Sequence, residues 1–113
     1  MSSVEFVKLD ETATLPTLDG EKDFVFYSNE VQIIPVNTIR KINSGVALSE
    51  ESKGAIFRVE EDETVPFDIG PGLYDSGRSG HRQRELCATI VNRTDDDITI
   101  NKGDKLGKLI RIV

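Results

Sequence analysis

Apolar residues alternate with polar ones along much of this chain, and this spacing of two constrains the fold more than any other feature. A β-strand places successive side chains on opposite faces, so such alternation is typical of a strand that buries one face. No stretch of 11 or more residues keeps the 3.6-residue spacing of a helix. The alternating apolar sets are Phe24 and Phe26; Val31 and Ile33; Val46 and Leu48; Leu86, Ala88 and Ile90; and Ile98 and Ile100.

Turn sequences separate these segments at short intervals. They are Asp19-Gly20, Ser44-Gly45, Lys53-Gly54, Gly70-Pro71-Gly72, residues 95–97 and Lys102-Gly103-Asp104. Many short strands between frequent turns predict an all-β barrel or sandwich, with at most a short helical turn near residues 49–53. Residues 1–17 show no clear period, so we expect an N-terminal arm or edge strand there and a β-barrel domain over residues 18–113. The final "KLIRIV" predicts a strand that runs to Val113.

Composition narrows the function classes. The chain has 113 residues, which fits one domain, and its net charge of −6 argues against sequence-independent binding of nucleic acid. No apolar run approaches the roughly 20 residues of a membrane helix, so no membrane partner is expected. The first ten residues carry acids and a single Lys, unlike a signal peptide, and one cysteine, Cys87, cannot form an internal disulfide. We therefore expect a cytoplasmic or virion protein, in which the Asn92-Arg93-Thr94 sequon is fortuitous.

The segment "GPGLYDSGRSGHRQREL" (residues 70–86) stands out in this acidic chain. Its glycines surround one carboxylate, Asp75, and basic residues follow. Glycine permits positive φ and lets a flat ligand approach the backbone closely, which suits a nucleotide-binding hairpin. The sequence Asp-Ser-Gly is also a common turn, so a turn-capping role for Asp75 stays open. The lone His81 and Cys87 cannot supply the three or four ligands of a zinc site, so no metal site is predicted.

The order of the motifs resembles the trimeric deoxyuridine triphosphatase (dUTPase) and deoxycytidine triphosphate (dCTP) deaminase superfamily. "GEKDFVFYS" places Asp23 at the Asp of the first motif, "GAIFRVE" places Arg58 at the Arg of the second, and "GLYDSGRSG" places Asp75 at the carboxylate of the third. "IIPVNTIRKINSGVAL" and "ATIVNRTDDDITINKGDKLGKLI" resemble the segments before the second motif and around the fourth. The resemblance covers roughly residues 14–113.

The resemblance implies a distorted jelly-roll barrel that assembles as a homotrimer. It implies that Asp75 orients the attacking water, as the catalytic carboxylate, if the protein is an enzyme. Mg²⁺ is then the expected cofactor, and otherwise none is expected. The nucleotide-binding residues that the matched motifs imply are Asp23, Arg58, Gly72, Asp75, Gly77 and Lys108.

The chain also departs from the family pattern. Arg78 stands where the family has a Tyr that stacks on deoxyribose, Val59 and Glu60 replace a Ser-Gly pair that helps hold phosphates, and Lys108 replaces a Gln. The acidic run at residues 60–63 is expected to repel a triphosphate unless metal ions bridge them, although a solvated loop is the better interpretation of that run. The family's glycine-rich C-terminal arm has no counterpart before Val113, and the nearby Glu85 precedes the strand in which a deaminase carries its catalytic Glu.

These departures favour a non-catalytic role in binding or assembly, with a trimeric viral or phage capsid decoration protein as the leading hypothesis. Arg78, Arg82 and Arg84 would then contact a capsid or other protein lattice, or a neighbouring subunit. The alternative is a dUTP diphosphatase, or a related deoxynucleotide triphosphate hydrolase, that uses Asp75. A third hypothesis is a sensor that binds a nucleotide without hydrolysis.

Overall fold

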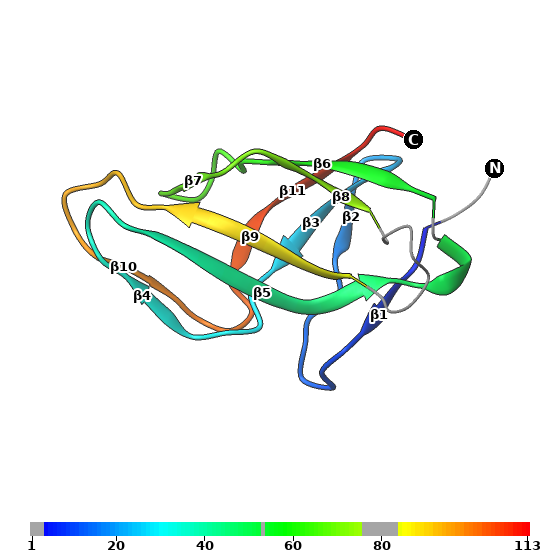
Figure 1. The fold of residues 1–113 in the computed structure, drawn as a ribbon, viewed down its shortest axis with the longest axis horizontal. Coiled ribbons are helices and arrows are strands. Elements are labelled where there is room, and N and C mark those ends of the chain that lie inside the picture. Colours follow the sequence, from blue (N-terminus) through cyan, green and yellow to red (C-terminus); the bar gives the residue numbers. More distant parts are fainter. Residues whose placement is uncertain (1–3, 53, 76–83) are drawn as a thin grey trace.

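The protein is built from two packed antiparallel sheets and a two-stranded extension (Figure 1). This computed structural model describes residues 4–52, 54–75 and 84–113. One sheet has the order β1 (Phe6–Lys8), β5 (Ile39–Leu48), β9 (Glu85–Val91), β7 (Asp68–Ile69); the other has the order β2 (Thr17–Asp19), β3 (Asp23–Tyr27), β11 (Lys105–Arg111), β6 (Ile56–Glu60), β8 (Gly72–Asp75). β4 (Gln32–Ile34) pairs with β10 (Ile98–Ile100), and a single 3₁₀ turn, Glu50–Ser52, is the only helix within the described ranges. The predicted all-β class is confirmed.

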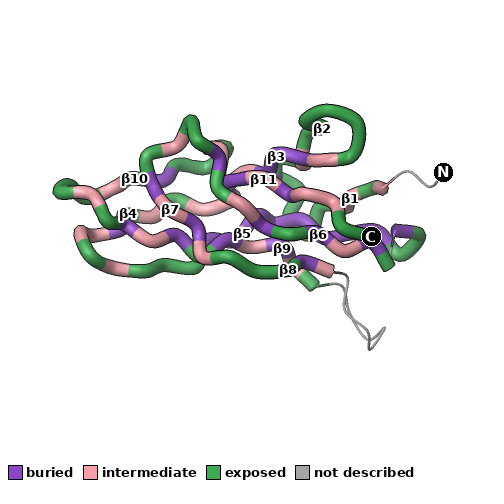
Figure 2. Tube along the Cα trace, turned by 90° about the horizontal axis from the view of Figure 1, so that it is seen from above, coloured by how far each residue is buried: buried purple, intermediate pink, exposed green. Residues whose placement is uncertain are grey.

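The core lies between the sheets and contains most of the alternating apolar residues predicted from the sequence (Figure 2). Contacts among three phenylalanine rings pack the edge strand β1 against this core. The Phe6 ring meets the Phe24 ring edge-on, with centroids 5.1 Å apart, and lies 6.2 Å from the Phe57 ring. Such pairs add to the stabilisation from burial alone. By contrast, every residue of β2 is exposed, so this edge strand contributes little to the core.

Strand β4 faces the opposite way from the sequence expectation. Val31 and Ile33 are 68% and 60% exposed, whereas Ile34 is fully buried. The segment "VQII" has apolar residues in both alternating sets, Val31 and Ile33 in one and Ile34 in the other, so its pattern alone does not determine which set faces the core. Pairing of Ile34 with Ile98 of β10 resolves the choice, and the prediction that Val31 and Ile33 form the buried face is wrong.

The chain ends differ in detail from the sequence expectation. β11 stops at Arg111, two residues before the predicted end, although the backbone N–H groups of Ile112 and Val113 still donate to the Ile56 carbonyl. At the other end of the chain, β1 and β2 are edge strands of different sheets. The division into residues 1–17 and 18–113 stays a prediction. Within the described ranges, no helix is long and apolar enough to cross a membrane.

Two irregularities set the strand registers. The pairing of β5 with β9 shifts between Asn43 and Ala47, where Gly45 has φ of 73° and its N–H donates to the Glu85 carboxylate over 2.8 Å. The pairing of β11 with β3 shifts between Lys105 and Gly107. A Cβ at Gly107 would lie 2.7 Å from the Glu60 carbonyl oxygen and would overlap the Ile69 side chain. Glycine is therefore the residue that this close approach of strands requires.

The corner after β9 is organised by a buried amide. Asn92 is fully buried, and its Nδ2 group donates to the carbonyls of Ile34 and Asp96, each over 2.9 Å. Its Oδ1 accepts hydrogen bonds from the Thr94 backbone N–H and hydroxyl. Each of these bonds satisfies a group that would be costly to bury alone. Asn92 thus ties β4 to the turn that leads into β10.

Candidate functional site

Four residues predicted to contact a nucleotide come from four different strands and share one face of the five-stranded sheet. Asp23 is on β3, Lys108 on β11, Arg58 on β6 and Asp75 on β8. Successive side chains of a strand point to opposite faces, so burial of their neighbours directs these four outward. The buried neighbours are Phe24, Phe57, Val59, Tyr74 and Leu109. We call this surface the outer sheet face.

Asp75 lies at the end of β8, opposite Ile56 of β6. Its Oδ1 is 3.8 Å from Nη1 of Arg84, the next described residue. Arg84, predicted to contact a partner, therefore forms an ion pair within its own chain. Of the other predicted residues, Gly77, Arg78 and Arg82 lie outside the described residues.

Tyr74, the neighbour of Asp75, bonds to two other parts of the chain. The Tyr74 hydroxyl accepts a hydrogen bond from the Leu48 N–H over 3.0 Å and donates one to the Arg84 carbonyl over 2.7 Å. Burial raises the pKa of Tyr74 to about 12, because an ionised phenolate is disfavoured away from water. This neutral hydroxyl holds the end of β8 and the start of β9 to β5, which fixes the backbone that carries Asp75.

The two cations of the outer sheet face are each paired with a carboxylate. Lys108 Nζ lies 3.8 Å from Asp19 Oδ2, and the Arg58 guanidinium contacts the Glu60 carboxylate. Lys108 is also the register partner of Glu60. The sequence did not identify Asp19 as a site residue, because it occurs in an Asp-Gly turn and reaches Lys108 only through the folded sheet.

Asp23 and Gly72, both predicted to bind a nucleotide, show no feature in this structure that points to ligand binding. One Asp23 oxygen accepts the Arg111 backbone N–H over 3.1 Å, which gives that carboxylate a structural role at the strand end. Gly72 has φ outside the positive region, and a Cβ added there would meet nothing within 4 Å. The fold itself therefore does not require glycine at position 72.

A hollow of about 440 Å³ lies beside Arg58, within the size range of small-ligand sites. Besides Arg58 it is lined by Val59, Glu60, Glu61, Ile69 and Pro71. Arg58 is the predicted nucleotide-binding residue that contributes to it. Val59 is 8% exposed and belongs to the core cluster. It therefore forms part of the wall of the hollow and offers no polar side chain to a phosphate.

The acidic run at residues 60–63 is not a set of four free carboxylates. Glu60 pairs with Arg58, and the buried Asp62 lies 3.5 Å from Lys105 Nζ. Asp62 also accepts the hydroxyl and backbone N–H of Thr64, over 2.6 and 2.8 Å, and these bonds lower the pKa of Asp62. In the protein without a ligand, two of the four charges are thus compensated. Among described residues, no group of three or more His, Cys, Asp or Glu side chains could hold a metal ion.

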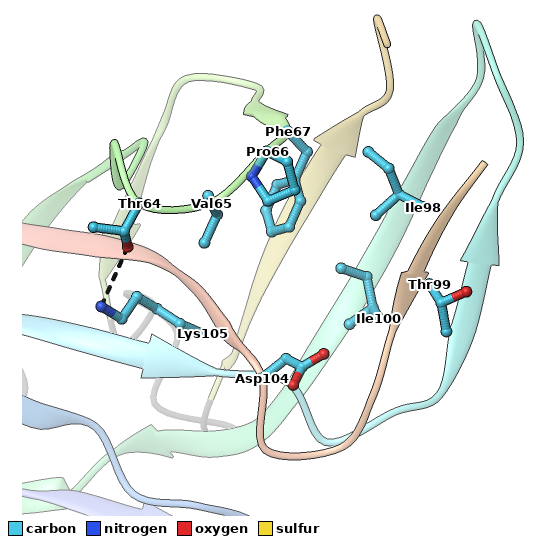
Figure 3. Close-up of a pocket in the computed structure, with 9 residues that line it drawn as sticks. All are labelled: Thr64, Val65, Pro66, Phe67, Ile98, Thr99, Ile100, Asp104 and Lys105. Carbon is cyan, nitrogen blue, oxygen red and sulfur yellow. Dashed lines mark hydrogen bonds between the residues drawn. The ribbon is translucent and has the colours of Figure 1, made fainter. Parts of the chain in front are cut away.

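A second hollow, of about 250 Å³, opens between the segment before β7 and strand β10 (Figure 3). Val65, Pro66 and Phe67 lie on one side of it, Ile98 and Ile100 on the other. Lys105 borders it and donates to the Thr64 hydroxyl over 3.4 Å. None of the described residues that the sequence predicted to bind a nucleotide lines this hollow, so it does not include the outer sheet face.

Comparison with known proteins shows which proteins this chain resembles in sequence and in fold. No protein-family model matches the chain. The deoxyuridine 5′-triphosphate nucleotidohydrolase of Paramecium bursaria Chlorella virus 1 is 28% identical over an alignment 116 residues long, which covers 97% of this chain and 79% of that protein. The dUTPase of Staphylococcus aureus phage phi11 superposes with a TM-score of 0.80 at 18% identity, over 98% of this chain and 90% of that one. The Staphylococcus bacteriophage 80alpha dUTPase gives a TM-score of 0.79 at 15% identity, over 97% and 89%.

These likenesses define the architecture as an all-β dUTPase-like fold. The resemblance to the dUTPase superfamily seen in the motifs is thereby confirmed. For a variant of the phage phi11 dUTPase, coordination of a structural Mg(II) ion has been described. None of these relatives is described as a capsid protein, so the comparisons lend no support to the capsid decoration hypothesis.

Proposed function

We propose that this chain binds deoxyuridine nucleotides and hydrolyses dUTP to dUMP and pyrophosphate, with Asp75 as the catalytic carboxylate. The observation that carries the proposal is that Asp75, Arg58 and Lys108, from three strands, share the outer sheet face. A carboxylate and two cations on one sheet face supply the groups that hydrolysis of a phosphoanhydride uses, a general base and phosphate-binding charges. The viral relative named as a nucleotidohydrolase adds support, because the match spans nearly the whole chain.

Each side chain has a defined task in this proposal. Asp75 accepts a proton from the water that attacks phosphorus, while the bond to the leaving pyrophosphate breaks. Arg58 and Lys108 bind phosphate oxygens; Arg can do so through two parallel hydrogen bonds and Lys as a point charge. The described residues offer no three-ligand metal cage, so a Mg²⁺ ion would arrive bound to the triphosphate.

We further propose that three copies of the chain assemble, as the superfamily resemblance implies. Large exposed apolar side chains give such an assembly surface to bury; they include Val31, Ile33, Ile39 and Leu73.

The test is release of pyrophosphate from dUTP in the presence of Mg²⁺. We expect the wild-type protein to release pyrophosphate and Asp75→Asn to lose at least about a hundredfold in rate, because loss of general base catalysis typically costs that much. Asp68→Asn is the matched control, since Asp68 lies on β7 of the other sheet and pairs with Arg93. It should retain the wild-type rate.

Three results separate the hypotheses. Hydrolysis that survives Asp75→Asn would exclude Asp75 as the catalytic group. Binding of dUTP without hydrolysis would leave a nucleotide sensor as the function. Absence of both binding and hydrolysis, with dCTP, dTTP and dATP also tested, would refute the proposed nucleotide function.

A further inference from the structure

The cations of the outer sheet face are occupied by carboxylates of the same chain. Lys108 lies between two acids: Asp19, 3.8 Å away, and Glu60, its register partner on β6. Glu60 in turn holds the Arg58 guanidinium. Arg58 and Lys108 are the cations that our proposed function assigns to the phosphates, so a phosphate chain entering this face meets two positive charges already paired.

These pairs are exposed enough to exchange partners. The Lys108 and Asp19 side chains are 30% and 49% exposed, and those of Arg58 and Glu60 are 53% and 40% exposed. Solvent-exposed pairs of this kind are weak, so a phosphate oxygen can displace the carboxylate. Lys105 differs, since its partner Asp62 is buried and held by Thr64. Exchange is therefore expected at Lys108 and Arg58.

Displacement does not remove the carboxylates. Asp19 and Glu60 belong to strands of the same sheet, so each stays close to the cation it has released. A bound phosphate chain then lies beside two uncompensated negative charges, and the repulsion grows with each charge on the chain. A nucleoside carries no phosphate and experiences no such repulsion.

We propose that Asp19 and Glu60 are specificity-determining residues that weaken binding of nucleotides in proportion to the length of their phosphate chain. This inference rests on the proposed nucleotide function. It identifies Asp19, which no sequence motif marks, as a member of the site. It also assigns Glu60, at the position of a phosphate-binding glycine in the related motif, a role in selecting among nucleotides.

The experiment measures dissociation constants by titration calorimetry for deoxyuridine, dUMP, dUDP and the non-hydrolysable α,β-imido analogue of dUTP. Wild type is compared with Asp19→Asn, Glu60→Gln and the double variant, each of which keeps the side-chain shape and removes one charge. We expect each single variant to bind the triphosphate analogue about two- to fivefold more tightly, dUMP less so, and deoxyuridine unchanged. The double variant should gain more affinity for the triphosphate analogue than either single variant. Glu60→Gln removes a charge next to both Arg58 and Lys108.

Glu61→Gln is the matched control. Glu61 lines the same hollow and loses the same charge, but within the described part of the chain it forms no ion pair with Lys or Arg. Its effect on the triphosphate analogue should be smaller than that of Glu60→Gln. An equal gain from Glu61→Gln would show a general charge effect and overturn the assignment. Thermal melting checks that every variant is folded.

The failures are distinguishable. Suppose that wild type binds the triphosphate analogue, and that the ratio of its dissociation constant to that of deoxyuridine is the same in Asp19→Asn and Glu60→Gln as in wild type. The inference then fails while the nucleotide function stands. If no deoxyuridine compound binds any variant, the proposed function fails. Inorganic tripolyphosphate then tests the pairing itself: tighter binding to the double variant than to wild type supports competition by the carboxylates, and no difference refutes it.

Discussion

The hydroxyl oxygen of Tyr74 lies 2.7 Å from the carbonyl oxygen of Arg84, and this hydrogen bond joins β8 to the residue that precedes β9. The same hydroxyl accepts the Leu48 N–H over 3.0 Å, so one phenol joins β5, β8 and β9. Asp75, which we propose as the catalytic carboxylate, therefore directly follows a residue that is fixed in the core. This arrangement orients a site residue through the packing of its neighbour rather than through its own contacts.

Replacing Tyr74 by Phe should destabilise the protein by about 1–3 kcal/mol, because the buried Leu48 N–H loses its acceptor and the Arg84 carbonyl loses a donor. Urea unfolding followed by circular dichroism measures the change. Tyr27→Phe is the control, since the Tyr27 hydroxyl bonds only to the exposed Thr17 hydroxyl among the hydrogen bonds of the described residues. That variant should change stability by less than about 0.5 kcal/mol. Equal losses would contradict the anchoring role of Tyr74.

Gly107→Ala should cost about 1–3 kcal/mol of stability, because the new methyl group would press against the Glu60 carbonyl and the Ile69 side chain. Gly72→Ala, on β8 at the edge of the same sheet, introduces a methyl group into open space and should stay within about 0.5 kcal/mol of wild type. Denaturant unfolding of both variants gives the comparison. A neutral Gly107→Ala would mean that the sheets separate easily at this point.

Acid unfolding should depend on Asp62. Its pKa is lowered in the folded state, chiefly by the hydrogen bonds from Thr64, so the ionised carboxylate stabilises the fold above the ordinary aspartate pKa of 3.8. This stabilisation is lost as the pH falls through the lower pKa of the folded state. Asp62→Asn should therefore show a smaller loss of stability than wild type between about pH 6 and about pH 3. Glu61→Gln serves as the neighbouring control, and an identical pH dependence of wild type and Asp62→Asn would refute the prediction.

A trimer of 12.5 kDa chains has a mass of about 37.5 kDa. We expect multi-angle light scattering at micromolar concentration to give this value, because the fold leaves several large apolar side chains exposed. Ile33→Glu tests one such position and should leave the fold intact, since Ile33 is 60% exposed. A monomer mass for the wild-type chain would contradict the prediction.

The sequence predicted the fold class well, because its alternation reports directly on burial. Phe24 and Phe26 of β3, and Leu86 and Ile90 of β9, are buried as the alternation indicates. The pattern was ambiguous where both faces of a strand are apolar, as in β4. Strand ends were less accurate, since the last residues of β11 leave the ladder while still bonding to Ile56.

The candidate site could be predicted only in part. The motifs predicted Arg58, Asp75 and Lys108, but their position on one face depends on the registers of β6 with β11 and with β8. No local pattern reports the register between strands that are distant in the sequence. The pairing of Asp19 with Lys108 joins opposite ends of the chain, so it was missed. The available sign was the predicted Asp19-Gly20 turn, because the hairpin that forms there sets Asp19 opposite Asp23, a predicted residue of this face.

The buried amide of Asn92 has a practical consequence for producing the protein. Asn92-Arg93-Thr94 is an acceptor sequence for N-linked glycans, and a glycan replaces one hydrogen of the Nδ2 group that here donates to both Ile34 and Asp96. A secretory host that attaches the sugar to the emerging chain would place a bulky, hydrated group at a fully buried position. Expression by that route should give misfolded material. Expression in a bacterial cytoplasm avoids the modification. The substitution Thr94→Val also avoids it by disrupting the sequon, at some cost to the turn.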